Sequence, residues 1–229
     1  MKFYHEVRGC SLAVDIVARE LGIALDLQWV DMRTKQLGDG SDYLLVNSKG
    51  TVPTLQLPDG QYLSEGAVIM QYLADQRGDT KLFAPPGSLA RYRIMEWMSF
   101  IAADLHKGGF MPLFKAVTPP AYKQIARQYL QGRLQWVNDQ LADRDFLTGP
   151  DFTIADAHCY TIAMWTRAHQ IDTSTWPHLE AYLLRVGSRP SVLAAEQAAR
   201  QQGERERAVQ QECGAATSPH CLILTGELT

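Results

Sequence analysis

The stretch Gly50-Thr-Val-Pro-Thr-Leu-Gln-Leu-Pro-Asp-Gly-Gln-Tyr-Leu-Ser-Glu-Gly66 decides the fold of this chain. Its alternating segments 54–57 and 62–63 predict two short strands of a hairpin. Pro58-Asp59-Gly60 predicts the turn between them, because proline presets φ and glycine accepts a positive φ. Ser64 stands where a helix N-cap is expected, directly before an apolar run. The stretch therefore predicts strand, turn, strand and helix N-terminus in succession.

Two features of this stretch suit a ligand. The backbone amides that follow Ser64 can form an anion site, reinforced by the helix dipole. Glu65 places a carboxylate at the same point, where it can hold an ammonium group. A site with both groups suits the zwitterionic head of an amino acid. The alternative interpretation is that Ser64 and Glu65 serve only to start the helix.

Val52-Pro53 bears on the same site. Proline cannot donate to a strand ladder, so Pro53 belongs at an edge or a bend. A cis bond would turn Val52 so that its N–H and C=O face a peptide ligand. Because only about 5–6% of X–Pro bonds in folded proteins are cis, the residues alone favour the trans isomer.

The composition is that of an ordinary globular protein. The chain has 229 residues, of which 46% are hydrophobic and 21% charged, with a net charge of −3. It offers no basic field for nucleic acid, no polybasic segment for a membrane and no apolar run of transmembrane length. The four cysteines, Cys10, Cys159, Cys213 and Cys221, show no zinc spacing. We therefore expect a cytoplasmic protein without a metal site.

The N-terminal part predicts alternating strands and helices. A strand over 2–5 precedes a helix that opens at Cys10-Ser11 and ends at Gly22, and a strand over 25–30 follows. A short helix is expected around 42–46, after a polar loop. With the hairpin and its helix, residues 1–80 then have the order βαβαββα, which is that of a thioredoxin-like domain.

The remainder predicts an all-helical domain. Residues 81–88 contain Pro85-Pro86-Gly87 and are expected to form a linker. Residues 89–200 carry helical periodicity, and Thr153 with Asp156 predicts a capping box. Pro177 suits the first turn of another helix. Residues 201–229 lose this periodicity, so we expect a poorly packed tail that carries Cys213 and Cys221 as incidental exposed thiols.

Cys10 and His106 are the candidates for reactive groups. A cysteine at a helix N-terminus can have its pKa lowered from ~8.5 to between 3.5 and 7.5. Ala13 occupies the position of the second cysteine in a dithiol motif, so the site is monothiol. The alternative for Cys10 is a buried, inert cysteine, as we expect for Cys159. His106 precedes Lys107-Gly108-Gly109, where the helix should loosen, and can equally be a dipole partner at a helix C-terminus.

Together, several motifs resemble those of bacterial beta-class glutathione transferases over roughly residues 1 to 195. They are Gly9-Cys10-Ser11-Leu12-Ala13, Asn47-Ser-Lys-Gly-Thr-Val-Pro53, Leu63-Ser-Glu-Gly66, Ile69-Met-Gln-Tyr-Leu-Ala-Asp75, Glu96-Trp97, Leu105-His-Lys107 and Phe152-Thr-Ile-Ala-Asp-Ala157. The resemblance implies a glutathione-binding enzyme of detoxification that forms homodimers, with the first domain of one subunit against the second domain of the other.

The same resemblance implies roles for individual residues. Pro53 is expected to be cis, with Val52 pairing through its backbone to the cysteinyl part of glutathione. Glu65, with the Gly66 amide or the Ser64 hydroxyl, would hold the γ-glutamyl ammonium and carboxylate. The other implied contacts are Lys35 and Lys107 near the glycine carboxylate, and Cys10 and His106 beside the glutathione sulfur.

Three features depart from the family pattern. Ser99 replaces an Asn that often contributes across the site, and the extra glycine in Gly108-Gly109 is expected to move the following loop. The tail after Arg200 matches nothing in the pattern.

Two functions remain open at this stage. The first is a transferase that delivers the glutathione thiolate to a small apolar electrophile, with Ser11 or His106 supporting the thiolate by a hydrogen bond, and with thiol–disulfide exchange through Cys10. The second is a non-catalytic protein of the same fold that binds glutathione or apolar ligands. The expected electrophile site is apolar and aromatic and involves Met111, Phe114, Trp165 and His169.

Overall fold

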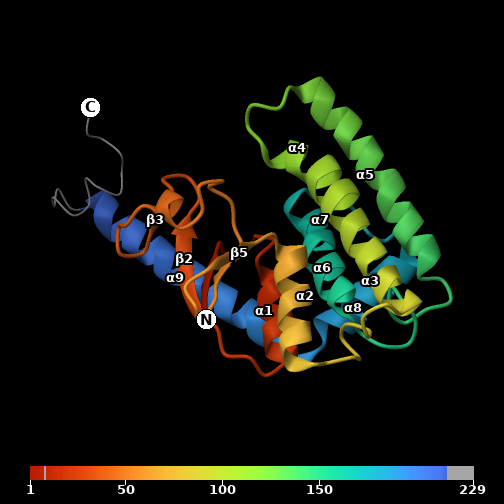
Figure 1. Cartoon of the computed structure of the whole chain (residues 1–229). Helices are drawn as coiled ribbons and strands as arrows, with labels where there is room; N and C mark the ends of the chain where they lie inside the picture. The colour runs from red at the N-terminus through yellow and green to blue at the C-terminus, as the bar shows by residue number, and fades with distance from the viewer. Residues whose placement is uncertain (8, 216–229) are drawn as a thin grey trace.

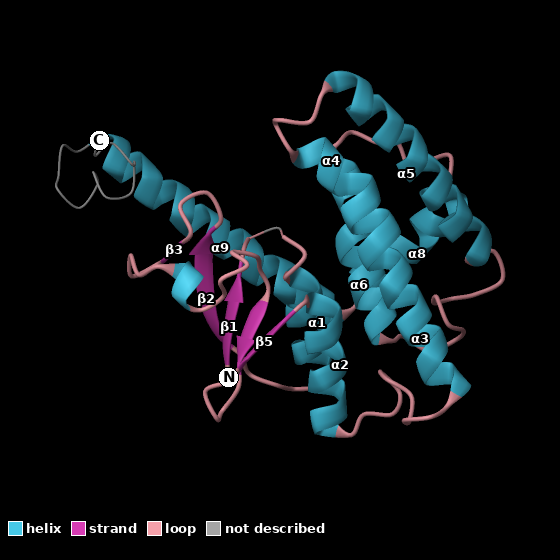
Figure 2. Cartoon of the chain, turned by 45° about the horizontal axis from the view of Figure 1, so that its top comes forward, coloured by secondary structure: helices cyan, strands magenta, loops and turns pink. Residues whose placement is uncertain are grey.

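A computed structural model describes residues 1–7 and 9–215, with side chains as far as Glu204. Its N-terminal elements are β1 (Lys2–His5), α1 (Leu12–Glu20), β2 (Asp26–Asp31), β3 (Gln36–Leu37), the 3-10 helix η1 (Tyr43–Leu45), β4 (Thr54–Gln56), β5 (Tyr62–Ser64) and α2 (Gly66–Arg77). Helices follow, as Figures 1 and 2 show: α3 (Leu89–Phe100), the π-helix η2 (Ile101–Phe110), α4 (Met111–Phe114), α5 (Pro120–Gln140), α6 (Ile154–Ala163), α7 (Trp165–Ala168), α8 (Pro177–Gly187) and α9 (Pro190–Ala215).

The N-terminal domain is built on a mixed sheet with the strand order β3-β2-β1-β4-β5. β1 and β2 are parallel and joined through α1, whereas β4 and β5 form the antiparallel hairpin predicted from the sequence. α1 and α2 lie between this sheet and the helical domain (Figure 1). The thioredoxin-like domain followed by an all-helical domain is therefore confirmed.

Two local predictions in this domain are wrong. The segment expected to be a loop before η1 contains β3, which pairs antiparallel with the end of β2. Ser64 is not the N-cap of α2, because it pairs with Thr54 as the last residue of β5. The N-cap is Glu65, whose side chain makes no capping hydrogen bond.

The helical domain also differs from expectation around His106. The helix does not end there, since α3, η2 and α4 follow one another without a break from Leu89 to Phe114. The Gly108-Gly109 pair consequently lies inside η2, and the loop that it was expected to move begins only after Phe114. The i→i+5 hydrogen bonding of a π-helix is rare and is frequently found at functional sites.

The C-terminal helix extends further than the periodicity indicated. α9 passes the expected boundary at residue 200 and continues to Ala215, and Gly203 is buried near Val7. The side chain of Cys213 and the whole of Cys221 lie outside the described residues, so their expected exposure stays a prediction. Within the described chain no helix is both long enough and apolar enough to cross a membrane.

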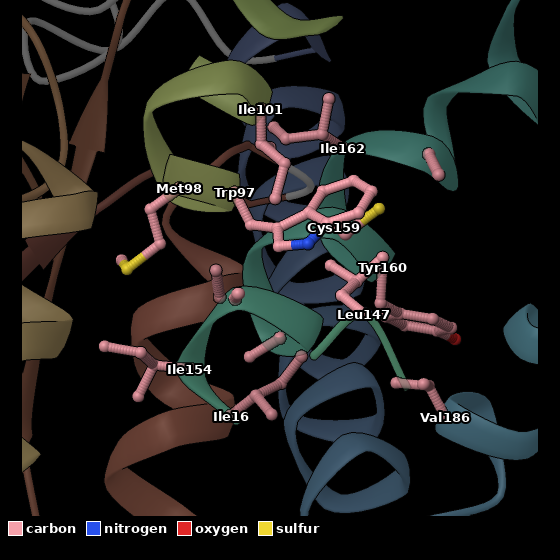
Figure 3. Packing of buried hydrophobic residues seen from close by; sticks show 14 of the residues in the cluster. Ile16, Trp97, Met98, Ile101, Leu147, Ile154, Cys159, Tyr160, Ile162 and Val186 are labelled. Atoms are coloured by element: carbon pink, nitrogen blue, oxygen red, sulfur yellow. The ribbon is translucent and has the colours of Figure 1, made fainter. Parts of the chain in front are cut away.

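The core is centred on α6, which is buried along its whole length. Figure 3 shows its side chains Cys159 and Ile162 among Trp97, Ile101 and Ile16, which come from α3, η2 and α1. The capping box predicted at its start is confirmed: Asp156 accepts from the Thr153 amide at 2.8 Å and from the Thr153 hydroxyl at 3.0 Å. Asp156 also accepts from the Leu147 amide at 2.9 Å and from the Tyr182 hydroxyl at 3.2 Å.

Replacing Asp156 by alanine should lower the free energy of unfolding by about 3 kcal/mol, because buried donors at Leu147 and Thr153 would lose their acceptor. Urea denaturation followed by circular dichroism measures this change. Asp151→Ala is the control, since Asp151 is an exposed carboxylate just before the same helix. Equal denaturation midpoints for the two variants would contradict the assigned role of Asp156.

Candidate functional site

The predicted site residues come from four segments that meet between the two domains. Cys10 lies in the turn before α1, Val52-Pro53 lies before β4, Glu65 begins α2, and His106 and Lys107 lie in η2. The charge of Lys107 acts on both Cys10 and Glu65, and Glu65 also acts on His106. The structure thus brings together residues that are far apart in the sequence.

The Val52-Pro53 bond is cis, as the resemblance implied. A buried polar cluster holds the backbone just before it. Asn47 donates from Nδ2 to the Thr51 carbonyl at 2.8 Å and to Thr54 Oγ1 at 3.0 Å. The Tyr43 hydroxyl donates to the same carbonyl at 2.8 Å and contacts the Thr54 hydroxyl at 2.8 Å. The loop that carries Val52 is therefore held in place by buried hydrogen bonds on both sides of it in the sequence, at Thr51 and Thr54.

Glu65 combines backbone strain with an exposed charge. Its φ is +73°, a conformation that a residue with a Cβ atom seldom adopts and that is often associated with function. This backbone exposes the first amides of α2, including that of Gly66, which have no acceptor within the helix. The Ser64 hydroxyl beside them is partly exposed. The first amides of α2 and the Glu65 carboxylate therefore lie next to each other at the start of the helix.

Lys49 is a residue that the sequence did not single out. Its ammonium lies 2.7 Å from Glu65 Oε1 and, by this hydrogen bond, holds the pKa of the Glu65 carboxyl below its usual value. Both side chains remain exposed, at 50% for Lys49 and 63% for Glu65. Lys49 lies within the quoted motif before Pro53, but no local pattern pairs it with a residue 16 positions later. The ion pair with Lys49 therefore demonstrates that the Glu65 carboxylate can bind an ammonium group.

The Cys10 thiol is in a different state from the one predicted. Burial raises its pKa to about 11, and the charges of Glu6 and Glu65 add to that rise, whereas Lys107 lowers the pKa. Protein surrounds the sulfur closely, although the residue keeps partial exposure. The thiol donates to the Val52 carbonyl at 3.6 Å. The prediction of a low-pKa Cys10 is wrong for this state of the protein, because desolvation outweighs the helix N-terminus.

Ser11 is adjacent to Cys10 but lies in different surroundings. Its side chain is 1% exposed, and its Oγ accepts from the Glu6 amide at 3.4 Å. It lines a cavity beneath α9 together with residues of β1 and β2. The structure therefore does not bring the Ser11 hydroxyl together with Glu65 and His106.

His106 is buried on η2, and its ring meets the Trp165 ring at a centroid distance of 5.0 Å. Burial lowers its pKa to about 4, with a further lowering from Lys107, so the imidazole is neutral at pH 7. A Cβ atom on Gly109 would lie 2.8 Å from Leu130 Cδ1, so glycine allows η2 to pack this closely on α5. That packing fixes the segment that carries His106 and Lys107.

Lys35 and Ser99 are less closely associated with the site. Lys35 has a φ of +60°, and its ammonium donates to the Gly50 carbonyl at 2.8 Å. It therefore lies beside the loop that leads to Val52. Ser99 is exposed on α3.

An aromatic cluster lies next to His106. The Trp165 ring is met edge-to-face by Phe110 at 5.8 Å and by Phe114 at 5.1 Å between centroids. The His169 ring lies 4.3 Å from that of Phe114. Phe114, Trp165 and His169, three of the residues named for the electrophile site, thus lie in one cluster. The fourth, Met111, is on α4 with Phe114 and is partly buried. Nowhere in the described residues do three or more His, Cys, Asp or Glu side chains group as metal ligands would.

Known proteins resemble this chain in both sequence and structure. Residues 9–76 match the family model "Glutathione S-transferase, N-terminal domain", and residues 101–190 match "Glutathione S-transferase, C-terminal domain". The glutathione S-transferase GstA of Escherichia coli O157:H7 is 44% identical over 192 residues, which cover 84% of this chain and 95% of that protein.

Two solved structures are similar over nearly their whole length. A beta-class glutathione S-transferase of Sphingomonas chungbukensis has a TM-score of 0.84 at 37% identity and covers 87% of this chain and 98% of its own. A sphingomonad glutathione S-transferase complexed with glutathione has a TM-score of 0.83 at 36% identity, with the same coverage of both chains.

The raised pKa of Cys10 predicts how its alkylation depends on pH. Below pH 9 the rate with iodoacetamide should rise about tenfold per pH unit, because the thiolate fraction grows by that factor below the pKa. The measurement uses Cys213→Ser/Cys221→Ser protein, in which the buried Cys159 is protected. Adding Lys107→Gln should slow alkylation at each pH, because this cation lowers the pKa of Cys10. A rate that levels off near pH 7 would show instead a stabilised thiolate.

Proposed function

This chain belongs to the glutathione S-transferase family, and on that premise we propose that it transfers the thiolate of glutathione to small apolar electrophiles. The observation that carries this proposal is the strained Glu65 at the start of α2, beside the cis Val52-Pro53 loop. An ammonium-binding carboxylate, bare helix amides and an exposed loop backbone together suit the γ-glutamyl and cysteinyl parts of glutathione.

The backbone of Val52 sets the position of the peptide. The cluster of Tyr43 and Asn47 holds the preceding carbonyl, so Val52 can pair with the cysteinyl unit without a loop rearrangement. Glu65 would exchange its ion pair with Lys49 for the ligand ammonium, and the amide of Gly66 with the Ser64 hydroxyl would hold the carboxylate. Lys35 and Lys107 supply positive charge for the glycine carboxylate.

Conjugation needs the glutathione sulfur as a thiolate. The cysteinyl thiol loses its proton to solvent, the thiolate forms a bond to the electrophilic carbon, and the leaving group departs with its electron pair. The protonated Cys10 thiol can donate a hydrogen bond to that thiolate, and Lys107 adds positive charge nearby. His106 is neutral and can donate in the same way. The Ser11 hydroxyl, which the sequence also suggested as a donor to the thiolate, is less suited to this role because it is buried and faces the Glu6 amide.

The electrophile would lie against the aromatic cluster of Phe114, Trp165 and His169. These rings adjoin His106, so an apolar substrate there lies next to the proposed position of the glutathione sulfur. The partial exposure of Phe114, at 45%, leaves apolar surface for such a substrate.

A second activity is thiol–disulfide exchange through Cys10. It is favoured by the partial exposure of this cysteine beside Val52, where the glutathione sulfur would lie. In exchange, the Cys10 thiolate attacks a glutathione mixed disulfide, forms a new disulfide and releases the other sulfur as a thiolate. Since Cys10 is protonated near pH 7, we expect exchange to be slow unless a bound ligand lowers its pKa.

The protein would act in the cytoplasm as a homodimer. Exposed apolar side chains on both domains support this assembly: Leu44, Leu45 and Tyr62 on the first, and Leu89, Tyr92 and Trp136 on the second. A cavity lined by Trp97, Phe100 and Trp136 opens between α3 and α5. Ser99 is exposed on α3 and, in the proposed dimer, would face the glutathione site of the partner subunit.

Sedimentation equilibrium at micromolar concentration tests the dimer. We expect a mass about twice the 25.6 kDa of the chain, because burying these exposed apolar side chains favours association. A mass that remains at that of a single chain would contradict the dimer and the proposed contribution of Ser99 to the partner's site.

Glu65→Gln tests the glutathione site. The substitution preserves shape but removes the charge that faces the ammonium, so glutathione should bind about tenfold more weakly, or about 1.5 kcal/mol for an exposed charge-assisted hydrogen bond. Isothermal titration calorimetry measures the change. Glu180→Gln is the control because this exposed glutamate lies on α8. Unchanged affinity in Glu65→Gln would remove Glu65 from the site.

Cys10→Ala separates the two activities. It should abolish exchange with glutathione mixed disulfides, because alanine has no nucleophile. Conjugation of 1-chloro-2,4-dinitrobenzene should fall by about tenfold or less, the worth of one hydrogen bond to the thiolate. Both assays use protein with Cys213→Ser and Cys221→Ser. An equal and large loss of both activities would make Cys10 central to conjugation, and an absence of conjugation in the unmodified protein would favour the non-catalytic alternative.

A further inference from the structure

The cavity beneath α9 that Ser11 lines contains none of the residues of the aromatic cluster. It has a volume of about 510 Å³ and is enclosed by β1 and β2, by the start of α1, and by Ala198, Ala199, Gln201 and Gln202 of α9. Figures 1 and 2 both show α9 running along the sheet at β2. Cavities of 300–1,000 Å³ are typical of small-molecule sites.

This cavity is separate from the proposed glutathione site. Its lining includes none of Cys10, Glu65 and His106. Ser11 lines it instead, and the charge of Glu6 acts on Cys10 from this side. The wall from α9 also lies beyond residue 190, where the match to the second family model ends. The cavity therefore depends on a part of this chain that the family model does not describe.

Its walls are largely apolar. Leu27 is 39% exposed although it is a strand residue, and Trp29 and Leu37 are partly exposed beside it. The Phe3 ring lies behind them, stacked on His5 at 5.9 Å. An aromatic ligand would cover apolar surface that folding has left in contact with water.

The charged groups in the lining are carboxylates. Among the described lining residues there is no Lys or Arg, and burial lowers the pKa of His5 to about 4, so its imidazole is neutral. Asp15 is paired with Arg19 at 3.0 Å, and Asp39 accepts from Ser41. A cationic ligand would therefore meet no described positive side chain in this cavity.

Glu6 is the carboxylate that lacks such a partner. Within the described part of the chain it makes no side-chain hydrogen bond or ion pair, and it is partly buried. The charge of Lys35 acts on it, but the ammonium of Lys35 donates to the Gly50 carbonyl instead. A partly buried, unpaired carboxylate at an apolar cavity attracts a cation that carries its own apolar surface.

We propose that this cavity is a second binding site, which takes a flat aromatic cation with its ring on the wall of Leu27 and Trp29 and its charge toward Glu6. The site binds a ligand other than the transferase substrates, and no bond is made or broken there.

Thioflavin T, a flat aromatic cation that fluoresces when held rigid, is a suitable probe for the full-length protein. We expect saturable binding of one dye per chain. Glu6→Gln should weaken binding about tenfold through loss of the charge. Leu27→Arg should abolish binding by placing a cation in the cavity. Leu184→Arg, which changes a 68% exposed leucine on α8, should leave it unchanged.

Two further measurements locate the dye. S-hexylglutathione, which occupies the transferase site, should not displace thioflavin T, and Leu27→Arg should conjugate 1-chloro-2,4-dinitrobenzene at the unmodified rate. The anionic dye 8-anilinonaphthalene-1-sulfonate should not compete. Displacement by S-hexylglutathione, or binding that is insensitive to both Leu27→Arg and Glu6→Gln, would overturn the proposal. If Leu27→Arg does not fold, the isosteric Glu6→Gln and the displacement experiment still decide.

Discussion

The arrangement of the helical domain depends on one buried carboxylate. Asp156 has no exposed surface, and it accepts hydrogen bonds from the amides of Leu147 and Thr153 and from the hydroxyl of Tyr182. These donors belong to three segments: the loop before α6, its N-cap, and α8. Burial raises the pKa of Asp156 to about 6, even though every one of these hydrogen bonds lowers it. The free-energy cost of desolvating the Asp156 carboxylate is offset because it accepts from donors that would otherwise be buried without partners.

The helix α6, whose start Asp156 holds in place, contacts the helices that position the candidate site. α6 packs against α1 and α2 of the first domain and against α3 and η2 of the second. The turn with Cys10 precedes α1, Glu65 precedes α2, and His106 lies in η2, so each functional segment adjoins a helix that rests on α6. A second histidine, His158, lies on α6 itself, and its pKa is lowered to about 3 by burial and by His106. Both histidines are neutral, so among the described residues the cation named as acting on Cys10 is Lys107.

The sequence predicted those features that depend on local pattern. The hairpin over residues 54–64 follows from its turn chemistry, and the capping box of Thr153 and Asp156 follows from their spacing. The two-residue strand β3 is too short to leave an alternating pattern. The N-cap was misplaced by one residue because Ser64 has the preferred side chain, whereas pairing with Thr54 keeps it in the sheet and leaves Glu65 at a positive φ. Local propensity favoured serine, and the tertiary pairing of β4 with β5 prevailed.

Cys10 shows why chemical state is harder to predict than position. A helix N-terminus contributes about half a positive charge, and the sequence reveals this contribution because it is local. The structure adds burial of the sulfur, the carboxylates Glu6 and Glu65, and the ammonium of Lys107. Of these, only Lys107 favours the thiolate, and it is 97 positions away in the chain. Burial has the largest effect on the Cys10 pKa, because it destabilises the charged thiolate and not the neutral thiol. A site that excludes water therefore keeps Cys10 protonated until a bound ligand changes the charges around the sulfur.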